Sequence, residues 1–101
     1  MIRETTAADH DELISLAAAS GLFAPDQTQL LADMLRAPAA SDVWLTLDCA
    51  GRPEGVAYFA PEKMTYGTWN LYWIAVHPRS QRQGFGKSLL RHIEHWLTER
   101  N

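Results

Sequence analysis

The stretch from residue 77 to residue 90, HPRSQRQGFGKSLL, contains the residue types that hold phosphate groups. Gly84 and Gly86 stand at the start of a segment whose apolar residues recur with helical spacing. The first amides of a helix have no partner within it and carry the positive end of its dipole, so they bind anions. Glycine leaves out the Cβ atoms that would keep phosphate oxygens away from the backbone. The pattern therefore predicts a phosphate site, with positive charge at its rim from Arg79, Arg82 and Lys87.

Two common phosphate-binding loops do not fit this stretch. A Walker A loop has four residues between its first glycine and its Gly-Lys-Ser/Thr triplet, and the position that should hold the first glycine is Gln81. A dinucleotide-binding G-x-G-x-x-G loop would need a third glycine where this chain has Leu89. A third pattern, Q-x-x-G-x-G between a basic loop and a helix, is matched at every position from Gln81 to Gly86. A glycine-rich turn into an ordinary helix is the alternative.

The charge distribution favours a small anionic ligand. The formal net charge of −3 divides into ten acidic and three basic residues over 1–62 (−7) and two acidic and six basic residues over 63–101 (+4). No carboxylate lies between Glu62 and Glu94. A local positive field on an acidic protein suits a compact anion, whereas a nucleic acid needs a broader basic surface. We expect no nucleic-acid partner.

Composition indicates a single globular domain over residues 1–101, with 47% hydrophobic residues and four tryptophans. The longest apolar run, residues 71–76, is far too short to cross a bilayer, so no membrane partner is expected. Cys49 is the only cysteine and cannot form an internal disulfide. Together with an acidic N-terminus that does not resemble a signal peptide, this predicts a cytoplasmic location.

The hydrophobic pattern predicts seven elements in the order β-α-α-β-β-β-α, which is an α/β (α+β) arrangement. The expected strands cover residues 1–4, 42–49, 54–60 and 67–76, and the expected helices cover residues 5–21, 24–38 and 84–100.

Several residues are expected to start or end these helices. Asp9 and Glu12 form a candidate capping box, Gly21 a helix end, and Pro25 and Pro38 the limits of the second helix. Helical spacing places two apolar faces in the core: Leu30, Leu31, Met34 and Leu35 in the second helix, and Leu89, Leu90, Ile93, Trp96 and Leu97 in the third. Residues 67–76 are apolar at nearly every position, so this strand is expected to be covered on both faces.

With these elements in place, the segment WIAVHPRSQRQGFGKSLLRHIEHWL (residues 73–97) resembles the central motif of the GNAT N-acetyltransferase superfamily. Members transfer an acetyl group from acetyl-CoA to an amine. The resemblance covers most of the chain and implies a mixed, mostly antiparallel sheet. The family normally continues into a fifth strand, a fourth helix and a hairpin, so the chain is expected to be truncated after the third helix and to match the first two-thirds of the fold.

The resemblance also implies a site for acetyl-CoA as co-substrate. The backbone of Ile74, Ala75 and Val76 would pair with the amides of the pantetheine arm. The amides of residues 82–87 would hold the pyrophosphate. The implied cofactor-binding residues of this loop are Gln81, Arg82, Gln83, Gly84, Phe85, Gly86 and Lys87. Family members commonly have Arg-Gly where this chain has Gln81-Arg82.

No catalytic residue can be assigned from the resemblance. Many members that acetylate lysine place a glutamate base where this chain has Asn70, and the tyrosine that often protonates the thiolate would follow Asn101. The expected activity is transfer to a primary amine of a small molecule or peptide. The alternatives are a CoA-binding or assembly module with little turnover, or a fragment of a longer active form. An uncharged, proline-free strand at the sheet edge predicts self-association, that is, a homo-oligomer.

The remaining candidates have simpler interpretations. His92 and His95 fit a solvated helix face better than a metal site, so no metal is expected. His77 is expected to cap a strand, and Cys49 to end one. Glu54 and Glu62 are weak candidates for a base acting through water. Five aromatic residues fit a core better than an acceptor pocket: Tyr58, Tyr66, Trp69, Tyr72 and Trp73.

Overall fold

A computed structural model describes residues 1–21, 23–62 and 67–100, and its four strands form one antiparallel sheet. The strand order is β1-β2-β3-β4, so each strand pairs with its neighbours in sequence. The strands are β1 (Ile2–Glu4), β2 (Val43–Cys49), β3 (Arg52–Pro61) and β4 (Trp69–Val76). Strand β4 therefore lies at one edge of the described sheet.

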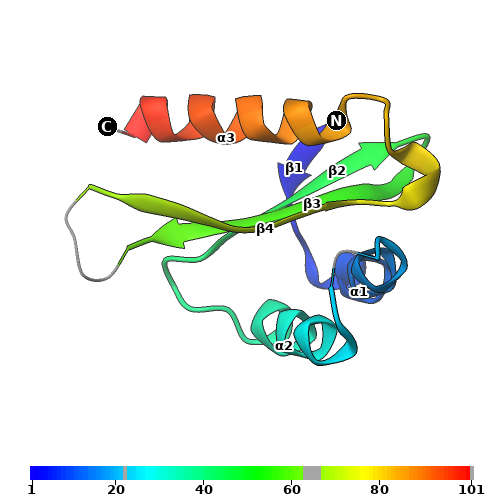
Figure 1. The fold of residues 1–101 in the computed structure, drawn as a ribbon. Coiled ribbons are helices and arrows are strands. Elements are labelled where there is room, and N and C mark those ends of the chain that lie inside the picture. Colours follow the sequence, from blue (N-terminus) through cyan, green and yellow to red (C-terminus); the bar gives the residue numbers. More distant parts are fainter. Residues whose placement is uncertain (22, 63–66, 101) are drawn as a thin grey trace.

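Helices cover both faces of this sheet (Figure 1). Helices α1 (His10–Ala19) and α2 (Pro25–Arg36) pack on one face, and α3 (Phe85–Arg100) crosses the other. Two short 3-10 turns, Ala7–Asp9 and Pro78–Ser80, precede α1 and α3. The predicted order of helices and strands and the α/β class are confirmed. All described strand pairs are antiparallel.

Two hydrophobic cores form because alternate strand residues point to opposite faces. The core under α1 and α2 includes Leu13, Leu16, Leu31, Leu35, Trp44, Val56, Tyr58 and Ala75. The core under α3 includes Leu45, Leu47, Ala57, Phe59, Leu89 and Ile93. Each helix thus buries one apolar face, as the spacing predicts. Leu30 and Leu90 are exceptions to the predicted faces, because they are 52% and 41% exposed.

The β2–β3 hairpin turns through Ala50 and Gly51, which have φ angles of 56° and 80°. Two left-handed residues make a turn whose twist matches that of the flanking strands, and glycine adopts this conformation without cost. The turn lies within the four residues, 50–53, that separate the two expected strands. Its register places Leu45 opposite Ala57 and Val43 opposite Phe59, which aligns the core residues of the two strands.

An irregularity in β4 changes which side chains face α1 and α2. Trp73 pairs with Tyr58 and Leu71 pairs with Phe59, so Tyr72 is an extra residue in β4 and forms a β-bulge. Consequently Tyr72 and Trp73 both approach the ring of Tyr58, with centroid distances of 5.2 and 5.7 Å. The expectation that β4 is covered on both faces is wrong, since Leu71 and Tyr72 are 41% and 49% exposed.

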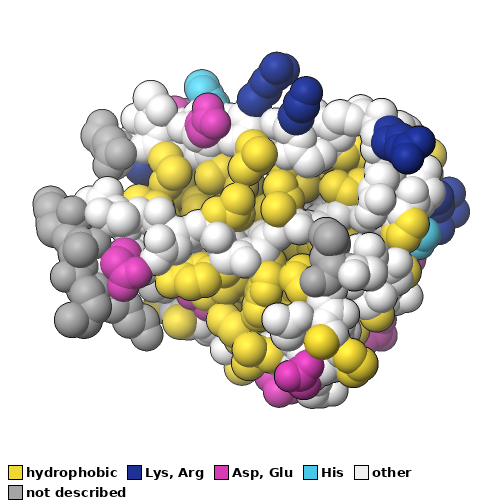
Figure 2. Space-filling view, in the orientation of Figure 1, with side chains coloured by type: hydrophobic (Ala, Val, Ile, Leu, Met, Phe, Trp, Pro, Cys, Tyr) yellow, Lys and Arg dark blue, Asp and Glu magenta, His cyan; other side chains and the backbone are white. Residues whose placement is uncertain are grey.

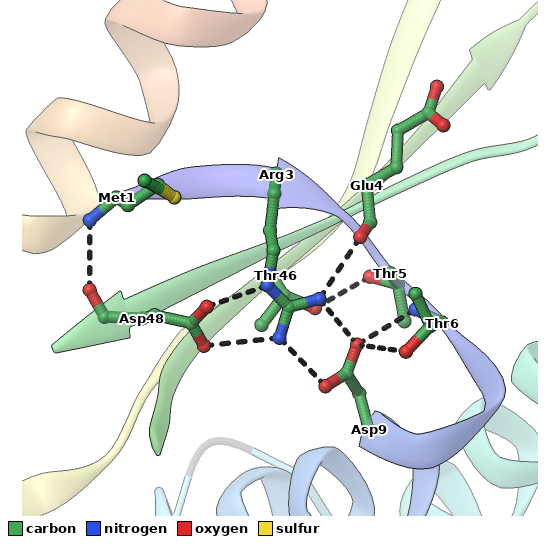
Figure 3. Close-up of polar contacts among 8 residues, drawn as sticks. All are labelled: Met1, Arg3, Glu4, Thr5, Thr6, Asp9, Thr46 and Asp48. Atoms are coloured by element: carbon green, nitrogen blue, oxygen red, sulfur yellow. Dashed lines mark hydrogen bonds and ion pairs between the residues drawn. The ribbon is translucent and has the colours of Figure 1, made fainter. Parts of the chain in front are cut away.

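The start of the chain is fixed by a polar network around Arg3 (Figure 3). Its guanidinium donates to Asp48 on β2 through Nε at 2.6 Å and to Asp9 through Nη1 and Nη2 at 2.7 and 2.8 Å. Asp9 also accepts from the backbone N–H of Thr6 at 2.8 Å. The predicted capping box of Asp9 and Glu12 is therefore wrong. Asp9 has helical dihedral angles, and its carboxylate turns back towards β1 instead of capping α1.

Gly21 and Pro25 behave as predicted. Gly21 follows α1 with a φ of 74°, and Pro25 is the first residue of α2. Tyr66, one of the aromatic candidates of the sequence, lies outside the described residues. Within the described part of the chain, no helix is long and apolar enough to cross a lipid bilayer.

Candidate functional site

A cleft of about 390 Å³ opens between the second half of β4 and the first turns of α3. Its lining residues come from the strand, the connecting loop and the helix: Ile74, Ala75, Val76, Gln81, Arg82, Gly86 and Leu90. Figure 2 shows hydrophobic side chains on both sides of the sheet edge, with Lys and Arg side chains on and beside α3. The structure thus brings six of the ten predicted site residues into one cleft. Leu90 was assigned to the core by its spacing but contributes to the cleft wall instead.

The four other predicted residues do not line the cleft with their side chains. Phe85 packs in the core under α3, where its ring contacts the cluster around Phe59 and Leu89. Gln83, Gly84 and Lys87 are exposed in the loop and at the start of the helix. Gln83, Gly84 and Phe85 could therefore contribute to the cleft only through their backbone amides, whereas Lys87 could also contribute the charge of its side chain.

The edge of β4 presents unpaired backbone groups to this cleft. The His77 amide donates to the Glu54 carbonyl at 2.9 Å, which directs the backbone groups of His77 towards β3. Because these directions alternate along a strand, the amides and carbonyls of Ile74 and Val76 point away from β3. The Val76 carbonyl accepts from the Gln81 side chain at 3.1 Å. Gln81 therefore ties the loop to the strand.

A row of free amides lies at the start of α3. The first backbone bond of the helix runs from the Ser88 amide to the Gly84 carbonyl at 3.0 Å. The amides of residues 82–87 donate no hydrogen bond to an acceptor in the described part of the chain. Six neighbouring donors at the positive end of a helix have the geometry and charge to hold an anion.

The two glycines of this row have different roles. Gly84 has a φ of 78°, a conformation that other residues rarely adopt. Gly86 has ordinary helical geometry, but a Cβ added there would meet no atom within 4 Å. Because Gly86 also lines the cleft, a side chain at this position would project into the cleft. Gly84 shapes the loop, and Gly86 keeps the cleft open.

Arg82 also has left-handed geometry, with a φ of 72°. A residue with a Cβ is disfavoured in this region, where glycine is the usual choice. The loop therefore keeps the backbone path that a glycine would give, while placing a guanidinium at the cleft wall. This geometry could not be foreseen from the residue type.

Arg79 does not contribute free charge to the rim, contrary to the expectation from the sequence. Its Nε donates to both carboxylate oxygens of Glu54, at 2.9 and 3.1 Å, and Arg52 Nε lies 3.3 Å from the same carboxylate. Burial alone would raise the pKa of Glu54. Hydrogen bonds from Arg79 and Ser80, together with the positive charges of Arg79 and Arg52, lower the pKa by more than burial raises it. The pKa of Glu54 therefore lies below its usual value. Arg82 and Lys87 form no ion pair with the described residues, and they supply the positive charge near the cleft.

Glu54 is therefore an anchor for the loop and not the base that its sequence position suggested. It is 2% exposed, which leaves no route for water to reach its carboxylate freely. One feature of the sequence indicates this role: Glu54 stands two residues after Arg52, on a strand otherwise rich in apolar residues.

The other ionisable candidates also have structural contacts. His77 Nδ1 accepts from the Arg79 amide at 3.2 Å, so His77 caps the 3-10 turn Pro78–Ser80 and not the end of β4, as the sequence had suggested. His95 pairs with Glu99 on the outer side of α3. Over residues 1–21, 23–62 and 67–100, no three His, Cys, Asp or Glu side chains come together in a group that could hold a metal ion.

A second cavity, of about 360 Å³, lies on the α2 side of β4. It is lined by Met34, Ala37, Ala39, Ser41, Asp42, Tyr58, Ala60, Pro61 and Tyr72. Tyr58 is 4% exposed and belongs to the core, as does the packed ring of Trp73, whereas Tyr72 is half exposed. Trp69 contacts Trp96 on the opposite side of the sheet. Of the aromatic candidates, Tyr58 and Tyr72 thus line this cavity.

Asn70 lies near the start of β4, two residues before Tyr72. Its side-chain amide donates to Glu62 Oε2 at 2.5 Å and lies 3.4 Å from the Tyr72 hydroxyl. A carboxamide is not basic at neutral pH, so Asn70 cannot serve as the catalytic base. Among the described residues that line the cleft above β4, Arg82 is the one with an ionisable side chain.

The shape and chemistry of the cleft suit a ligand with a phosphate end and an amide-bearing arm. The amides of residues 82–87 provide donors for phosphate oxygens. The outward backbone groups of Ile74 can pair with amides in the manner of an added strand. Ile74, Val76 and Leu90 add apolar side chains to the lining of the same cleft.

Comparison with protein-family models matches residues 8–101 to the acetyltransferase (GNAT) family. A GNAT-family protein from Desulfovibrio desulfuricans superposes on the whole chain with a TM-score of 0.89 and 25% identity, and this chain spans 67% of it. A GNAT-family acetyltransferase from Brucella melitensis, solved in complex with acetyl-CoA, gives a TM-score of 0.81 at 22% identity and is covered over 70% of its length.

A third similar structure is the ribosomal-protein-S18-alanine N-acetyltransferase from Escherichia coli. It gives a TM-score of 0.80 at 21% identity, with 99% of this chain aligned to 60% of that one. No significant match to a curated protein sequence was found. These neighbours share the described fold and extend beyond the part that this chain spans.

Proposed function

Because its residues 8–101 match the family model, this chain belongs to the GNAT acetyltransferase family, and we propose that it transfers an acetyl group from acetyl-CoA to a primary amine. The observation that carries the proposal is the row of free amides over residues 82–87, which meets the open edge of β4 at one cleft. The Brucella melitensis neighbour, solved with acetyl-CoA, supports the same ligand for this cleft.

Each part of the cleft has a separate task in this proposal. The amides of residues 82–87 bind the pyrophosphate, with Arg82 and Lys87 adding charge. The backbone of residues 74–76 binds the pantetheine arm through the groups of Ile74 and Val76 that point away from β3, and it fixes the direction of the arm along β4. Acetyl-CoA supplies a thioester, whose C–S bond breaks as the neutral amine forms the new C–N bond and releases a proton. Coenzyme A leaves as the thiolate and takes up a proton from water.

In this proposal the residues of the chain bind and orient the two reactants, and they contribute little to proton transfer. No carboxylate or imidazole lines the cleft in the described part of the chain, so the amine proton passes to water. Preorganised positioning of two reactants can by itself supply a large part of a rate enhancement. We expect slow turnover, limited by the small fraction of acceptor that is present as free amine.

A second candidate function is a CoA-binding or assembly module with little or no turnover. Asn70, which donates its amide to Glu62, favours this alternative, because it leaves the β4 position without a base. A thiol-release assay with acetyl-CoA and simple amines distinguishes the two. Release above the rate of spontaneous hydrolysis supports the enzyme, whereas binding without release supports the module.

We also propose that a second copy pairs with the chain at the first half of the β4 edge, residues 69–72, which the pantetheine arm does not use. Strand β4 has no charged residue and no proline, and it exposes Leu71 and Tyr72. Such an edge is a template for another strand. For location we propose the cytoplasm, on the basis of the unpaired Cys49.

A further inference from the structure

We propose that the side chain of Gln81 is a stand-in for the pantetheine arm. In the free protein its amide occupies the carbonyl of Val76, and coenzyme A displaces it so that the arm can pair with β4. The contact that carries this inference is the hydrogen bond from Gln81 Nε2 to the Val76 carbonyl, at 3.1 Å. The inference rests on the proposed function, because it takes the arm to bind along β4 and adds a side chain that controls access to this edge.

The Val76 carbonyl is one of four backbone groups that the arm can use. The His77 amide donates to the Glu54 carbonyl, so the alternation along the strand directs the amides and carbonyls of Ile74 and Val76 away from β3. These two donors and two acceptors suit an extended ligand that carries amides of its own. In the described part of the chain, the Val76 carbonyl is the only one of the four with a side-chain hydrogen bond.

Gln81 holds its amide where the arm would place one of its own. A ligand that pairs with a strand sets its donor nitrogen about 2.9 Å from the carbonyl oxygen, and Gln81 Nε2 lies at nearly this distance. Gln81 also lines the cleft together with Ile74 and Val76. Its side chain therefore occupies an acceptor that the arm needs, together with part of the space beside β4.

The loop keeps its shape when the side chain of Gln81 is released. The Gln81 amide closes the turn Pro78–Ser80 by donating to the Pro78 carbonyl at 3.3 Å, and Arg79 forms its ion pair with Glu54. Neither contact involves the side chain of Gln81. Because Gln81 is exposed, its released amide can bond to water. Displacement therefore breaks one exposed hydrogen bond and leaves the row of free amides in place.

The stand-in makes the two ends of coenzyme A unequal in binding. A ligand that needs a partly populated state of the protein loses affinity in proportion to that population. The arm needs the state in which Gln81 is released, whereas a pyrophosphate on the amides of residues 82–87 does not. Since an exposed hydrogen bond contributes only modestly to stability, we expect the arm to lose about twofold to fivefold in affinity.

Two fragments of coenzyme A test this inference by NMR titration. Pantetheine carries the amides of the arm and no phosphate, and adenosine diphosphate carries the pyrophosphate and no arm. Gln81→Ala should bind pantetheine about twofold to fivefold more tightly than the wild type does, with unchanged affinity for adenosine diphosphate. Gln29→Ala removes the same side chain, with its one exposed hydrogen bond to Asp33, from α2 and should change neither affinity.

Unchanged or weaker binding of pantetheine to Gln81→Ala would overturn the inference. Unchanged binding would mean that the Val76 carbonyl accepts from Gln81 and from the arm at once. Weaker binding would mean that Gln81 supports the arm instead of competing with it.

The wild-type protein gives a second readout that does not depend on a variant. Pantetheine should release the side-chain amide of Gln81, so the exchange of its protons with water should become faster during the titration. Adenosine diphosphate should leave this exchange rate unchanged. A side-chain amide that keeps its exchange rate when the protein is saturated with pantetheine would also overturn the inference.

A coenzyme A titration of the wild type separates this inference from the proposed function. If coenzyme A binds but either readout of Gln81 fails, the stand-in role is wrong and the proposed function stands. If neither coenzyme A nor pantetheine binds, the proposed function fails, and the role of Gln81 fails with it.

Discussion

Arg79 Nε lies 2.9 and 3.1 Å from the two carboxylate oxygens of Glu54, and this contact joins the loop before α3 to the centre of the sheet. Glu54 is 2% exposed, while the side chain of Arg79 keeps 42% of its surface. A buried carboxylate needs such partners, because an unpaired one is costly to remove from water. The loop that carries Gln81 and Arg82 is therefore anchored to β3 by the ion pair of Arg79 with Glu54, and not by apolar packing alone.

Replacing this carboxylate should loosen the loop and destabilise the protein. We expect Glu54→Gln to lower the free energy of unfolding by roughly 2–4 kcal/mol, because Arg79 and Arg52 lose their common partner. Urea unfolding measures the change. Glu94→Gln, at an exposed position of α3, serves as control and should cost less than about 0.5 kcal/mol. Equal effects of the two substitutions would contradict the anchoring role.

Stability should fall in acid because two buried carboxylates have lowered pKa values. The hydrogen bond from Arg3 lowers the pKa of Asp9 against the opposing effect of burial, and Arg79 lowers that of Glu54. A carboxylate with a lowered folded-state pKa stabilises the protein above its unfolded value, near 4, and loses this contribution as the pH falls towards the folded value. Thermal unfolding measured between pH 7 and pH 2.5 should show a decline that begins near pH 4–5.

The Arg3 network should account for part of that acid sensitivity. Arg3→Met should destabilise the protein by roughly 2–4 kcal/mol at pH 7 and flatten the pH dependence below pH 4. Arg36→Met is the matched control, since Arg36 makes only an exposed contact of 3.6 Å with Asp11. An Arg3→Met protein that keeps the full wild-type pH dependence would show that Asp9 is not held by Arg3.

Arg82→Gly should raise stability and weaken coenzyme A binding at once. The left-handed backbone at a φ of 72° favours glycine, so the variant should gain about 0.5–1 kcal/mol. Loss of the guanidinium should reduce affinity for a phosphate-bearing ligand and flatten its salt dependence. Gln83→Gly, at a neighbouring position without positive φ, should instead lose stability. A less stable Arg82→Gly protein would contradict this account of the loop.

A charge on β4 should interfere with self-association. Leu71→Lys places an ammonium on the exposed edge strand, which is a common way in which proteins prevent strand pairing. Light scattering should show a larger monomer fraction for this variant than for the wild type. Leu30→Lys, at a 52% exposed position on α2, is the control and should leave the oligomer unchanged. A monomeric wild-type protein would refute pairing at this edge.

Local signals made most of the fold predictable from the sequence. Pro25 marks the start of α2, Gly21 follows the end of α1, and Ala50-Gly51 supplies the turn of the hairpin. Each of these residues acts through its own backbone geometry or its immediate neighbours. The Q-x-x-G-x-G spacing likewise places the free amides at the start of α3, since helix position and residue type determine them.

Features that depend on distant contacts could not be predicted in this way. The bulge at Tyr72 arises from the register of β4 on β3, and a continuous apolar run does not define a register. The burial of Glu54 depends on Arg79, 25 residues later in the chain. The sequence spacing of Asp9 and Glu12 matches a helix cap, whereas the pairing of Asp9 with Arg3 becomes visible only once β1 lies beside the start of α1.

The most direct test of the central claim is a calorimetric titration of coenzyme A into the wild-type chain and Gly86→Val. A Cβ at Gly86 meets no atom within 4 Å, so the variant should fold and melt like the wild type while its side chain blocks the cleft. Gly84 is less suitable, because its φ of 78° makes any substitution there strained. We predict saturable binding to the wild type and at least about tenfold weaker binding to Gly86→Val, a loss of about 1.4 kcal/mol. Equal affinity in the two proteins, or no binding to the wild type, would contradict the assignment of this cleft.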